Sequence, residues 1–151
     1  MRIGKQTGFT LLGLLFLVAV FGVGLAALGS VWQTATAREK EAQLLFVGDQ
    51  YRRALASYYR QAPGADKRYP KKLEDLLRDP RFPHTVRHLR HLWPDPITGG
   101  GWVLERDAAG GIKGLHSPSL ATPRKIAGFP KEYATFEGAG RYADWVFLAA
   151  P

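Results

Sequence analysis

Two hydrophobic patterns follow one another in the N-terminal part of the chain. From Phe9 to Trp32 the sequence runs for 24 residues without a charged side chain. As an α-helix rising about 1.5 Å per residue, this segment would be about 36 Å long, which suffices to cross the hydrocarbon core of a bilayer. Beyond Ala37 the pattern is amphipathic, with apolar residues at spacings of three and four, namely Leu44, Val47, Tyr51, Leu55 and Tyr58. No proline precedes Pro63, so we predict one helix over about 9–61, with a transmembrane half and an amphipathic half.

Glycine and proline divide the rest of the chain into short elements. Ala62-Pro63-Gly64-Ala65 ends the predicted helix. The expected elements are a short apolar-faced segment over 71–78, one or two helical turns over 85–92, strands over 102–106 and 112–116 joined by a hairpin turn, a loop-rich segment over 117–143 and a last strand over 144–148. The predicted fold class is α+β, in which the long spine helix packs against a small C-terminal antiparallel sheet. That sheet is expected to bury Trp102, Leu104, Ile112, Leu115, Trp145 and Phe147.

Composition narrows the chemistry that the chain can perform. It has 21 basic and 13 acidic residues, a net charge of +8, and 46% hydrophobic residues, which is too many for a disordered chain. It has no cysteine, which excludes disulfides, cysteine-ligated metal sites and thiol catalysis. Basic residues are mixed with acidic ones, as in Arg38-Glu39-Lys40-Glu41, and cluster little with aromatic residues. We therefore expect no nucleic-acid partner.

Three histidines are the candidates for a metal site. His84, His88 and His91 are spaced four and three apart, so on a helix they would share one face, as zinc ligands do. Arg87 and Arg90 lie between them, and no neighbouring carboxylate supports an imidazole. A solvated histidine cluster without a metal is the favoured interpretation.

No arrangement typical of an active site stands out. Glu74 and Asp75 are adjacent, and neighbouring carboxylates diverge on a helix. His116 with Ser117 or Ser119 would supply a base and a nucleophile, but sequence neighbours rarely form such a pair and no oxyanion hole is evident. We therefore expect no enzymatic activity and no cofactor.

The residues before the apolar run are open to three interpretations. One is a plain signal anchor. Another is a cleaved secretory signal with a cut site at Ala35-Thr36-Ala37, although such signals have an apolar stretch of only about 7–15 residues. The third rests on the short, basic and polar segment Gly4-Lys5-Gln6-Thr7-Gly8, followed at once by Phe9-Thr10-Leu11-Leu12. This arrangement resembles the class III signal of type IV pilins and type II secretion pseudopilins, and we favour it. The resemblance implies a membrane peptidase that cuts after Gly8 and methylates Phe9.

Gly13 departs from the pattern of that family. Most members have glutamate as the fifth residue after the cut, where it is thought to pair with the N-terminal amine of a neighbouring subunit. A charge buried in lipid needs such a partner, and Gly13 cannot provide one. Either this subunit sits where the pairing is not needed, such as the filament tip, or the amine is satisfied otherwise. The simpler interpretation is that Gly13 is a small packing residue like Gly22, Gly24 and Gly29.

The C-terminal part resembles the major pseudopilin of type II secretion systems. The matching pieces are Tyr69-Pro70 with Leu73-Glu74-Asp75-Leu76, Leu89-Arg90-His91-Leu92 before Pro94-Asp95-Pro96, Trp102 with a hairpin ending near Ser117, and Ala143-Asp144-Trp145. In that family an acidic loop after the hairpin binds calcium. Here the segment from Ser117 to Lys125 has no carboxylate and two cations, whereas calcium takes six to eight oxygen ligands, usually with several carboxylates. We therefore expect no calcium site of the family's type.

The resemblance also implies an organisation and a function. It places a leader at 1–8, a transmembrane helix at 9–36 and a periplasmic head at 37–151 that includes the upper spine helix. The implied function is that of a structural subunit of a type II secretion pseudopilus in the bacterial inner membrane, which assembles by helix packing and drives protein export across the outer membrane. The implied partners are other pseudopilins in a helical filament, the prepilin peptidase and the inner-membrane assembly platform. Two alternatives stay open: a minor pilin of a type IV pilus, in adhesion or DNA uptake, and a membrane-anchored periplasmic adaptor that does not polymerise.

Overall fold

A computed structural model describes residues 7–64 and 67–150 of the protein. Its longest element is helix α1 (Thr7–Arg60), whose side chains are described over 11–21 and 35–60. The chain divides into two units, Met1–Ala37 and Arg38–Pro151, which we describe separately. The fold class is α+β, with a long helix and a small three-stranded antiparallel sheet, as the sequence predicts.

The first unit is helical from Thr7 onward, and most of the predicted leader lies outside the described residues. The large apolar side chains between Leu11 and Phe21 are exposed by 53–72% of their surface. Among the described residues, no helix combines the length and the apolar character needed to cross a membrane. The transmembrane half of the helix stays a prediction.

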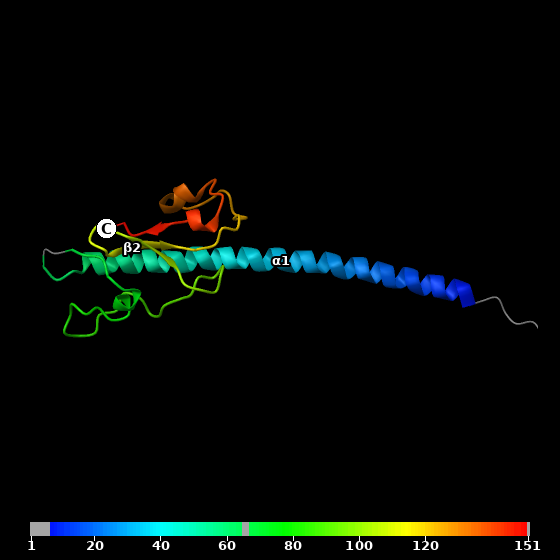
Figure 1. Cartoon of the computed structure of the whole chain (residues 1–151), viewed down its shortest axis with the longest axis horizontal. Coiled ribbons are helices and arrows are strands. Elements are labelled where there is room, and N and C mark those ends of the chain that lie inside the picture. The colour runs from blue at the N-terminus through cyan, green and yellow to red at the C-terminus, as the bar shows by residue number, and fades with distance from the viewer. Residues whose placement is uncertain (1–6, 65–66, 151) are drawn as a thin grey trace, which may run out of the picture. The chain divides into compact units, whose positions relative to one another are not determined.

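In the second unit, α1 is amphipathic and forms one wall of the core. Its residues in the hydrophobic core follow the predicted spacing and are Leu44, Val47, Tyr51, Ala54, Leu55 and Tyr58. In Figure 1 the segment around the 3₁₀-helix η1 (Leu73–Leu76) and the segment holding η2 (Lys131–Phe136) and η3 (Tyr142–Asp144) lie on opposite sides of this helix. The amphipathic half predicted for the spine is therefore confirmed.

The sheet contains the two strands of a hairpin and one short C-terminal strand. The strands are β1 (Val103–Arg106), β2 (Ile112–His116) and β3 (Phe147–Leu148), in the order β1-β2-β3 and antiparallel throughout. In the hairpin turn, the Asp107 carboxylate accepts hydrogen bonds from the backbone N–H groups of Ala109 and Gly111, at 2.9 and 2.7 Å. Gly110 follows with φ +81°, a conformation that favours glycine. The hairpin confirms the prediction.

Aromatic rings from the C-terminal segment complete the core. The rings of Phe136 and Trp145 are stacked, with centroids 5.6 Å apart and planes 4° apart, and Phe147 packs edge-on against Phe136. Of the six residues expected to be buried, Ile112, Leu115, Trp145 and Phe147 are fully buried, while Trp102 and Leu104 are partly buried against the core. The segment expected to be loop-rich also contains η2 and η3, which deliver Tyr133, Phe136 and Tyr142 to this core.

The helical turns expected over 85–92 do not form, and this prediction was wrong. The backbone N–H groups of His88 and Leu89 both donate to the carbonyl of Leu76, at 2.9 and 3.0 Å, and the Asp79 N–H donates to Val86 at 3.0 Å. These long-range bonds tie the segment to η1 and take the place of hydrogen bonds within a helix. The last strand is also shorter than expected, because Tyr142–Asp144 forms η3 instead.

Gly48 in α1 is predicted to be intolerant of any side chain. A Cβ atom there would lie 2.5 Å from Cε1 and Cε2 of the Phe147 ring, far inside van der Waals contact. Although alanine gains about 1 kcal/mol in helix propensity over glycine, overpacking of the core should dominate, and Gly48→Ala should lower the free energy of unfolding by about 1–3 kcal/mol. Urea denaturation followed by tryptophan fluorescence measures the change. Gly140→Ala is the matched control, because a Cβ there meets nothing within 4 Å; equal stability of the two variants would contradict the prediction.

Candidate functional site: the loop held by Glu41

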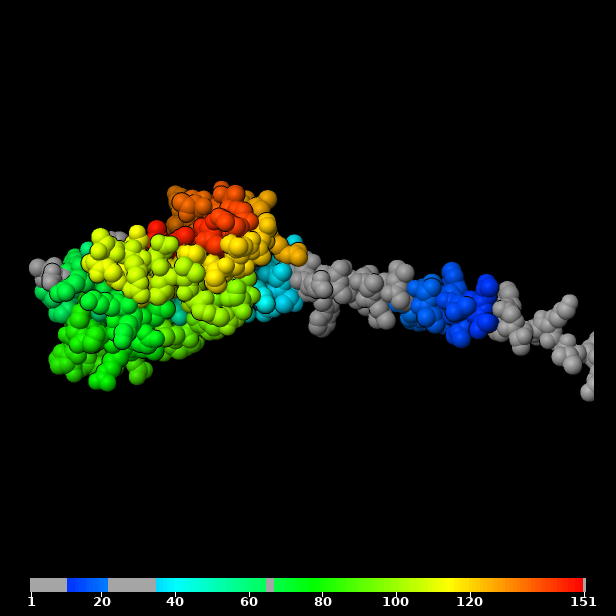
Figure 2. All heavy atoms as spheres, in the orientation of Figure 1, coloured from blue at the N-terminus to red at the C-terminus, as the bar shows by residue number. Residues whose placement is uncertain are grey.

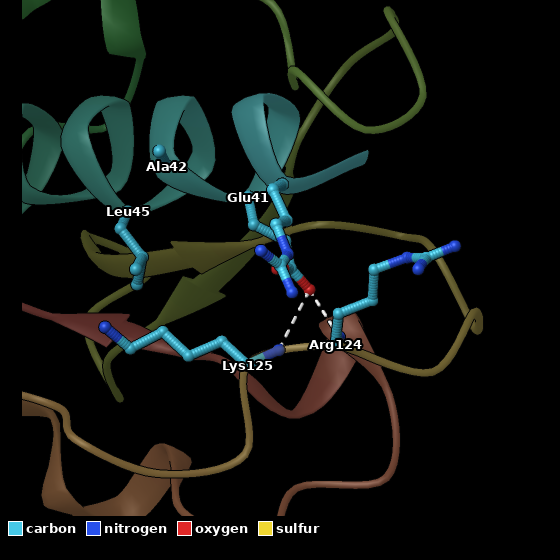
Figure 3. A pocket seen from close by; sticks show the side chains of 6 residues that line it. Glu41, Ala42, Leu45, Arg124 and Lys125 are labelled. Atoms are coloured by element: carbon cyan, nitrogen blue, oxygen red, sulfur yellow. Dashed lines mark hydrogen bonds between the residues drawn. The ribbon is translucent and has the colours of Figure 1, made fainter. Parts of the chain in front are cut away.

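A buried carboxylate of α1 holds the loop that follows the hairpin. Glu41 is only 4% exposed, and its Oε1 atom accepts hydrogen bonds from the backbone N–H groups of Arg124 and Lys125, the latter at 3.3 Å. The hydroxyl of Tyr142 donates to the same oxygen at 2.8 Å. Figure 3 shows both backbone bonds converging on Glu41 from the loop. One carboxylate therefore joins the helix, the 117–130 loop and η3.

The surface around this carboxylate is an open pocket with a cationic rim. It has a volume of about 650 Å³ and is lined by Arg38, Glu41, Ala42, Leu45, Arg124 and Lys125. From the clamped backbone, the side chains of Arg124 and Lys125 extend in opposite directions (Figure 3). The Lys125 ammonium lies 4.9 Å from the centroid of the Phe129 ring, close enough for a cation–π interaction. The arrangement suits recognition of anions at its rim, while its buried acid is occupied by the protein's own donors.

Tyr142 is held in its protonated form by the same contacts. Burial, followed by the hydrogen bond and the negative charge of Glu41, raises the pKa of the Tyr142 hydroxyl to about 12. The hydroxyl therefore remains a hydrogen-bond donor over the physiological range, which keeps the contact between α1 and η3 intact.

A second buried carboxylate, Asp95, organises the turn before β1. Its Oδ2 atom accepts hydrogen bonds from the hydroxyls of Thr98, at 2.6 Å, and Ser117, at 2.8 Å, and from the Thr98 N–H at 3.2 Å. Its Oδ1 atom accepts from the Ile97 N–H at 3.2 Å. Asp95 thereby joins the start of the hairpin to its end. The Ser117 hydroxyl is engaged with Asp95 and not with His116, whose Nδ1 atom lies 2.9 Å from the Ser117 carbonyl oxygen.

A third buried carboxylate completes a series of serine, histidine and aspartate that the sequence analysis missed. Ser57 Oγ lies 2.9 Å from His88 Nδ1, and His88 Nε2 lies 3.2 Å from Asp79 Oδ2. Since an ionised carboxylate only accepts hydrogen bonds, His88 Nε2 carries a proton and donates it to Asp79. Ser57 precedes His88 by 31 residues and Asp79 precedes it by nine, and these spacings match no local motif.

The surroundings of this series suit a structural role better than nucleophilic catalysis. The His88 side chain is 1% exposed, and Arg81 occupies Asp79 through Nε and Nη2, at 2.8–3.1 Å and 2.6 Å. Ser57 lies inside α1, where the backbone N–H groups are used by the helix and cannot form an oxyanion hole. Arg81 Nη2 also donates to the Tyr58 carbonyl at 2.7 Å. The group therefore fastens the 79–88 segment to the C-terminal end of α1.

The hydrogen-bond donors around Asp79 and the charge of Arg81 also set its ionisation. Burial alone would favour the neutral acid and raise the pKa of Asp79. Hydrogen bonds from the side chain and backbone of Arg81 and from the His88 side chain, together with the charge of Arg81, instead lower this pKa below its usual value. The carboxylate is therefore charged wherever the head is folded at neutral pH.

The residues predicted for processing and assembly lie in the first unit. Gly8 and Phe9 fall in the first turns of α1, where the side chains are outside the described residues. Gly13 is in the described part, and a Cβ atom there would meet nothing within 4 Å. Nothing in these contacts tests their predicted roles.

The three candidate metal ligands do not share a face, because the helix that would align them is absent. His84 is exposed, with its ring 5.6 Å from that of Phe82, and the His91 ring lies 3.9 Å from that of Trp93. His88 is buried against Asp79, so the expectation of a solvated cluster without a supporting carboxylate was wrong at this histidine. Within residues 7–64 and 67–150, as far as their side chains are described, no group of three or more His, Cys, Asp or Glu residues could hold a metal ion.

One signal for the Glu41 site is present in the sequence. Glu41 lies three residues before Leu44, on the apolar stripe of the amphipathic helix rather than on its polar face. A carboxylate in that position must find donors when the stripe is buried. Its partners, the N–H groups of Arg124 and Lys125, belong to the backbone, and side-chain patterns do not reveal them.

Comparisons of this chain with protein-family models, with curated proteins and with solved structures found no match.

The Asp79 group predicts a loss of stability in acid. Because the pKa of Asp79 is lowered in the folded state, its contribution is present above the unfolded value of about 3.9 and is lost as the pH falls through the folded value. Asp79→Asn should lower the free energy of unfolding at pH 7 by about 3–5 kcal/mol, since Arg81 loses its buried partner, and should flatten the acid limb of the stability profile. Urea denaturation at several pH values tests this. The exposed Glu132→Gln serves as control, and a parallel acid limb in Asp79→Asn and the native chain would refute the assignment.

Removal of the Glu41 carboxylate should release the 117–130 loop. In Glu41→Ala, two backbone N–H groups and the Tyr142 hydroxyl lose their acceptor, so we expect a loss of about 2–3 kcal/mol in the free energy of unfolding. Trypsin should then cleave after Arg124 or Lys125 much faster than in the native chain. Glu39→Ala, which removes an exposed acid on the same helix, is the control. Unchanged proteolysis in Glu41→Ala would show that the loop is held by other contacts.

Proposed function

We propose that this chain is a single-pass structural subunit of a pseudopilus of the type II secretion kind. Residues 9–36 anchor it in the bacterial inner membrane, and the head, 37–151, lies in the periplasm. The prepilin peptidase removes 1–8 and methylates Phe9. The subunit then joins other pseudopilins on the inner-membrane assembly platform, and the growing filament drives protein export across the outer membrane.

The observation that carries this proposal is the row of exposed apolar side chains at the start of α1. Between Leu11 and Phe21 each large apolar side chain is more than half exposed, and no charged residue occurs from Gln6 to Ala37. Leaving apolar surface in water costs about 25 cal/mol per Å². A lipid bilayer before assembly, and sister helices afterwards, remove this cost.

The head favours a mechanical role over a chemical one. Its buried carboxylates Glu41, Asp79 and Asp95 are each engaged by hydrogen-bond donors from the chain's own loops. Hydrogen bonds of this kind make the loops rigid, which suits a subunit that transmits force. The energy of assembly then comes from helix packing and buried apolar area.

Gly13 bears on the position of the subunit in the filament. It offers no carboxylate to the N-terminal amine of a neighbour, and the surroundings of its Cα are open. We place the subunit where no such neutralisation is needed, as at the tip.

Mass spectrometry of the protein purified from membranes tests the proposal directly. The mature chain should begin with N-methylated Phe9, since the cut follows Gly8. Gly8→Leu should leave the leader attached, because a side chain now occupies the position before the cut, whereas Gly4→Leu should be processed normally. A mature chain starting at Met1 or at Arg38 would contradict the proposal. Failure to cross-link to any related subunit in cells, despite correct processing, would favour an adaptor that does not polymerise.

A further inference from the structure

We propose that the 117–130 loop is a membrane-contact surface that docks on anionic phospholipid headgroups at the periplasmic face of the bilayer. The inference rests on the proposed function, because it needs the apolar part of α1 to lie in that bilayer. It adds a ligand class, a lipid phosphate, and a set of residues that recognise it.

The loop has the composition of a segment that lies at a membrane interface. Leu120 and Ile126 are each 68% exposed, among the most exposed large apolar residues of the described chain. From Ser117 to Lys131 there is no acidic residue, while Arg124, Lys125 and Lys131 are basic. Segments that combine exposed apolar side chains with cations bind at the boundary between lipid headgroups and acyl chains. The apolar side chains become buried there, and the cations are attracted to anionic lipid.

Two segments distant in sequence combine their cations at one place. Arg38 from α1 and Arg124 and Lys125 from the loop line the same pocket. The Glu41 carboxylate offsets part of their charge, but it is buried and its Oε1 already accepts three hydrogen bonds, so the exposed charges at the rim of the pocket are all positive. An anion at the rim therefore meets three cations and no competing exposed carboxylate among the pocket's lining residues.

The position of Arg38 in the sequence indicates which anion would bind in this pocket. Arg38 is the first charged residue after the uncharged run that ends at Ala37, so in a membrane-spanning chain it stands at headgroup level. Figure 2 shows the 117–128 part of the surface beside the first turns of α1 that belong to the second unit, which begins at Arg38. Lipid phosphates are therefore the anions nearest to this pocket.

The conformation of the 117–130 loop is fixed by the protein's own contacts, without lipid. Pro118, Pro123 and Pro130 restrict its backbone, and the Glu41 clamp fixes it between the second and third of them. A preformed surface loses little conformational entropy on docking. Glu41 is thus a positioning residue for lipid recognition.

Single-cysteine reporters on the full-length chain test the proposal, since the native chain has no cysteine. An environment-sensitive fluorophore on Ile126→Cys reports on the loop, one on Leu17→Cys reports on the anchor, and one on the exposed hairpin residue, Ala109→Cys, serves as control. The protein is reconstituted into vesicles of phosphatidylcholine alone or mixed with phosphatidylglycerol, and spin-labelled lipids quench probes that enter the bilayer. We expect quenching at position 126 in the anionic vesicles, loss of this quenching at high salt, and none at position 109.

The outcomes separate the loop proposal from the proposed function. Quenching at 17 without quenching at 126 overturns the loop proposal and leaves the membrane anchor standing. Absence of quenching at both positions overturns both. Quenching at 126 that is equal in the two kinds of vesicle refutes recognition of lipid phosphate. Protection of the 126 probe only when other copies of the chain are present identifies a neighbouring subunit as the occupant and also overturns the proposal.

Charge variants test the recognising residues themselves. Replacing Arg38, Arg124 and Lys125 by glutamine should lower the ratio of docked to undocked loop by about fivefold per cation at low salt, because each basic residue near an anionic surface contributes about that factor. The matched control replaces the exposed Arg60, Arg78 and Arg90, which carry the same total charge but do not line the pocket. Equal losses in the two triple variants would show that net charge alone attracts the head, and would overturn the assigned site. Free inorganic phosphate, added at constant ionic strength, should not release the loop from the anionic vesicles.

Discussion

The burial of one face of α1, from Leu44 to Tyr58, is the constraint on which the rest of the head depends. A sheet of three short strands, one of them only two residues long, is marginal without a partner surface. The helix supplies this surface, and rings from the C-terminal segment close over it, with Phe147 fitted against the bare backbone at Gly48. The segments on either side of the helix have little regular structure of their own, so their positions follow from what they bury against it.

Buried carboxylates accept the hydrogen bonds of backbone N–H groups in the loops, where regular secondary structure does not. A loop packed against a core still has backbone N–H groups that need acceptors. Glu41 provides them for Arg124 and Lys125, Asp95 for Ile97 and Thr98, and Asp79 for Arg81. Each acid also binds a side-chain donor from another part of the chain, so that one buried charge organises a turn and locates it at once. This explains why acids are found in the interior of a protein with a net positive charge.

How far the sequence predicts this structure depends on the range of the interactions involved. The spine helix and the hairpin follow from local periodicity and from Asp107 and Gly110, and both were predicted. The 85–92 segment was predicted wrongly, because its amides bond to Leu76, a partner that no local pattern reveals. The Ser57–His88–Asp79 series was missed for the same reason. The burial of Glu41 could be predicted from its position on the apolar stripe of the helix. Its partners could not, because they are backbone N–H groups, which side-chain patterns do not reveal. The last strand was predicted over 144–148 and forms only at Phe147–Leu148. The 3₁₀-helices η2 and η3 were not predicted, because they depend on packing of their aromatic rings against the core, which propensity does not encode.

The long separation between the partners of Glu41 bears on how the head is made. Glu41 and Tyr142 are 101 residues apart, and Arg124 follows Glu41 by 83. On a ribosome the helix emerges first and its apolar face stays uncovered until the last rings have been synthesised. The head must therefore close after translation of nearly all of its residues, by a slow search for distant contacts. During that interval the apolar face of the helix is exposed, which makes the unfinished chain prone to aggregation.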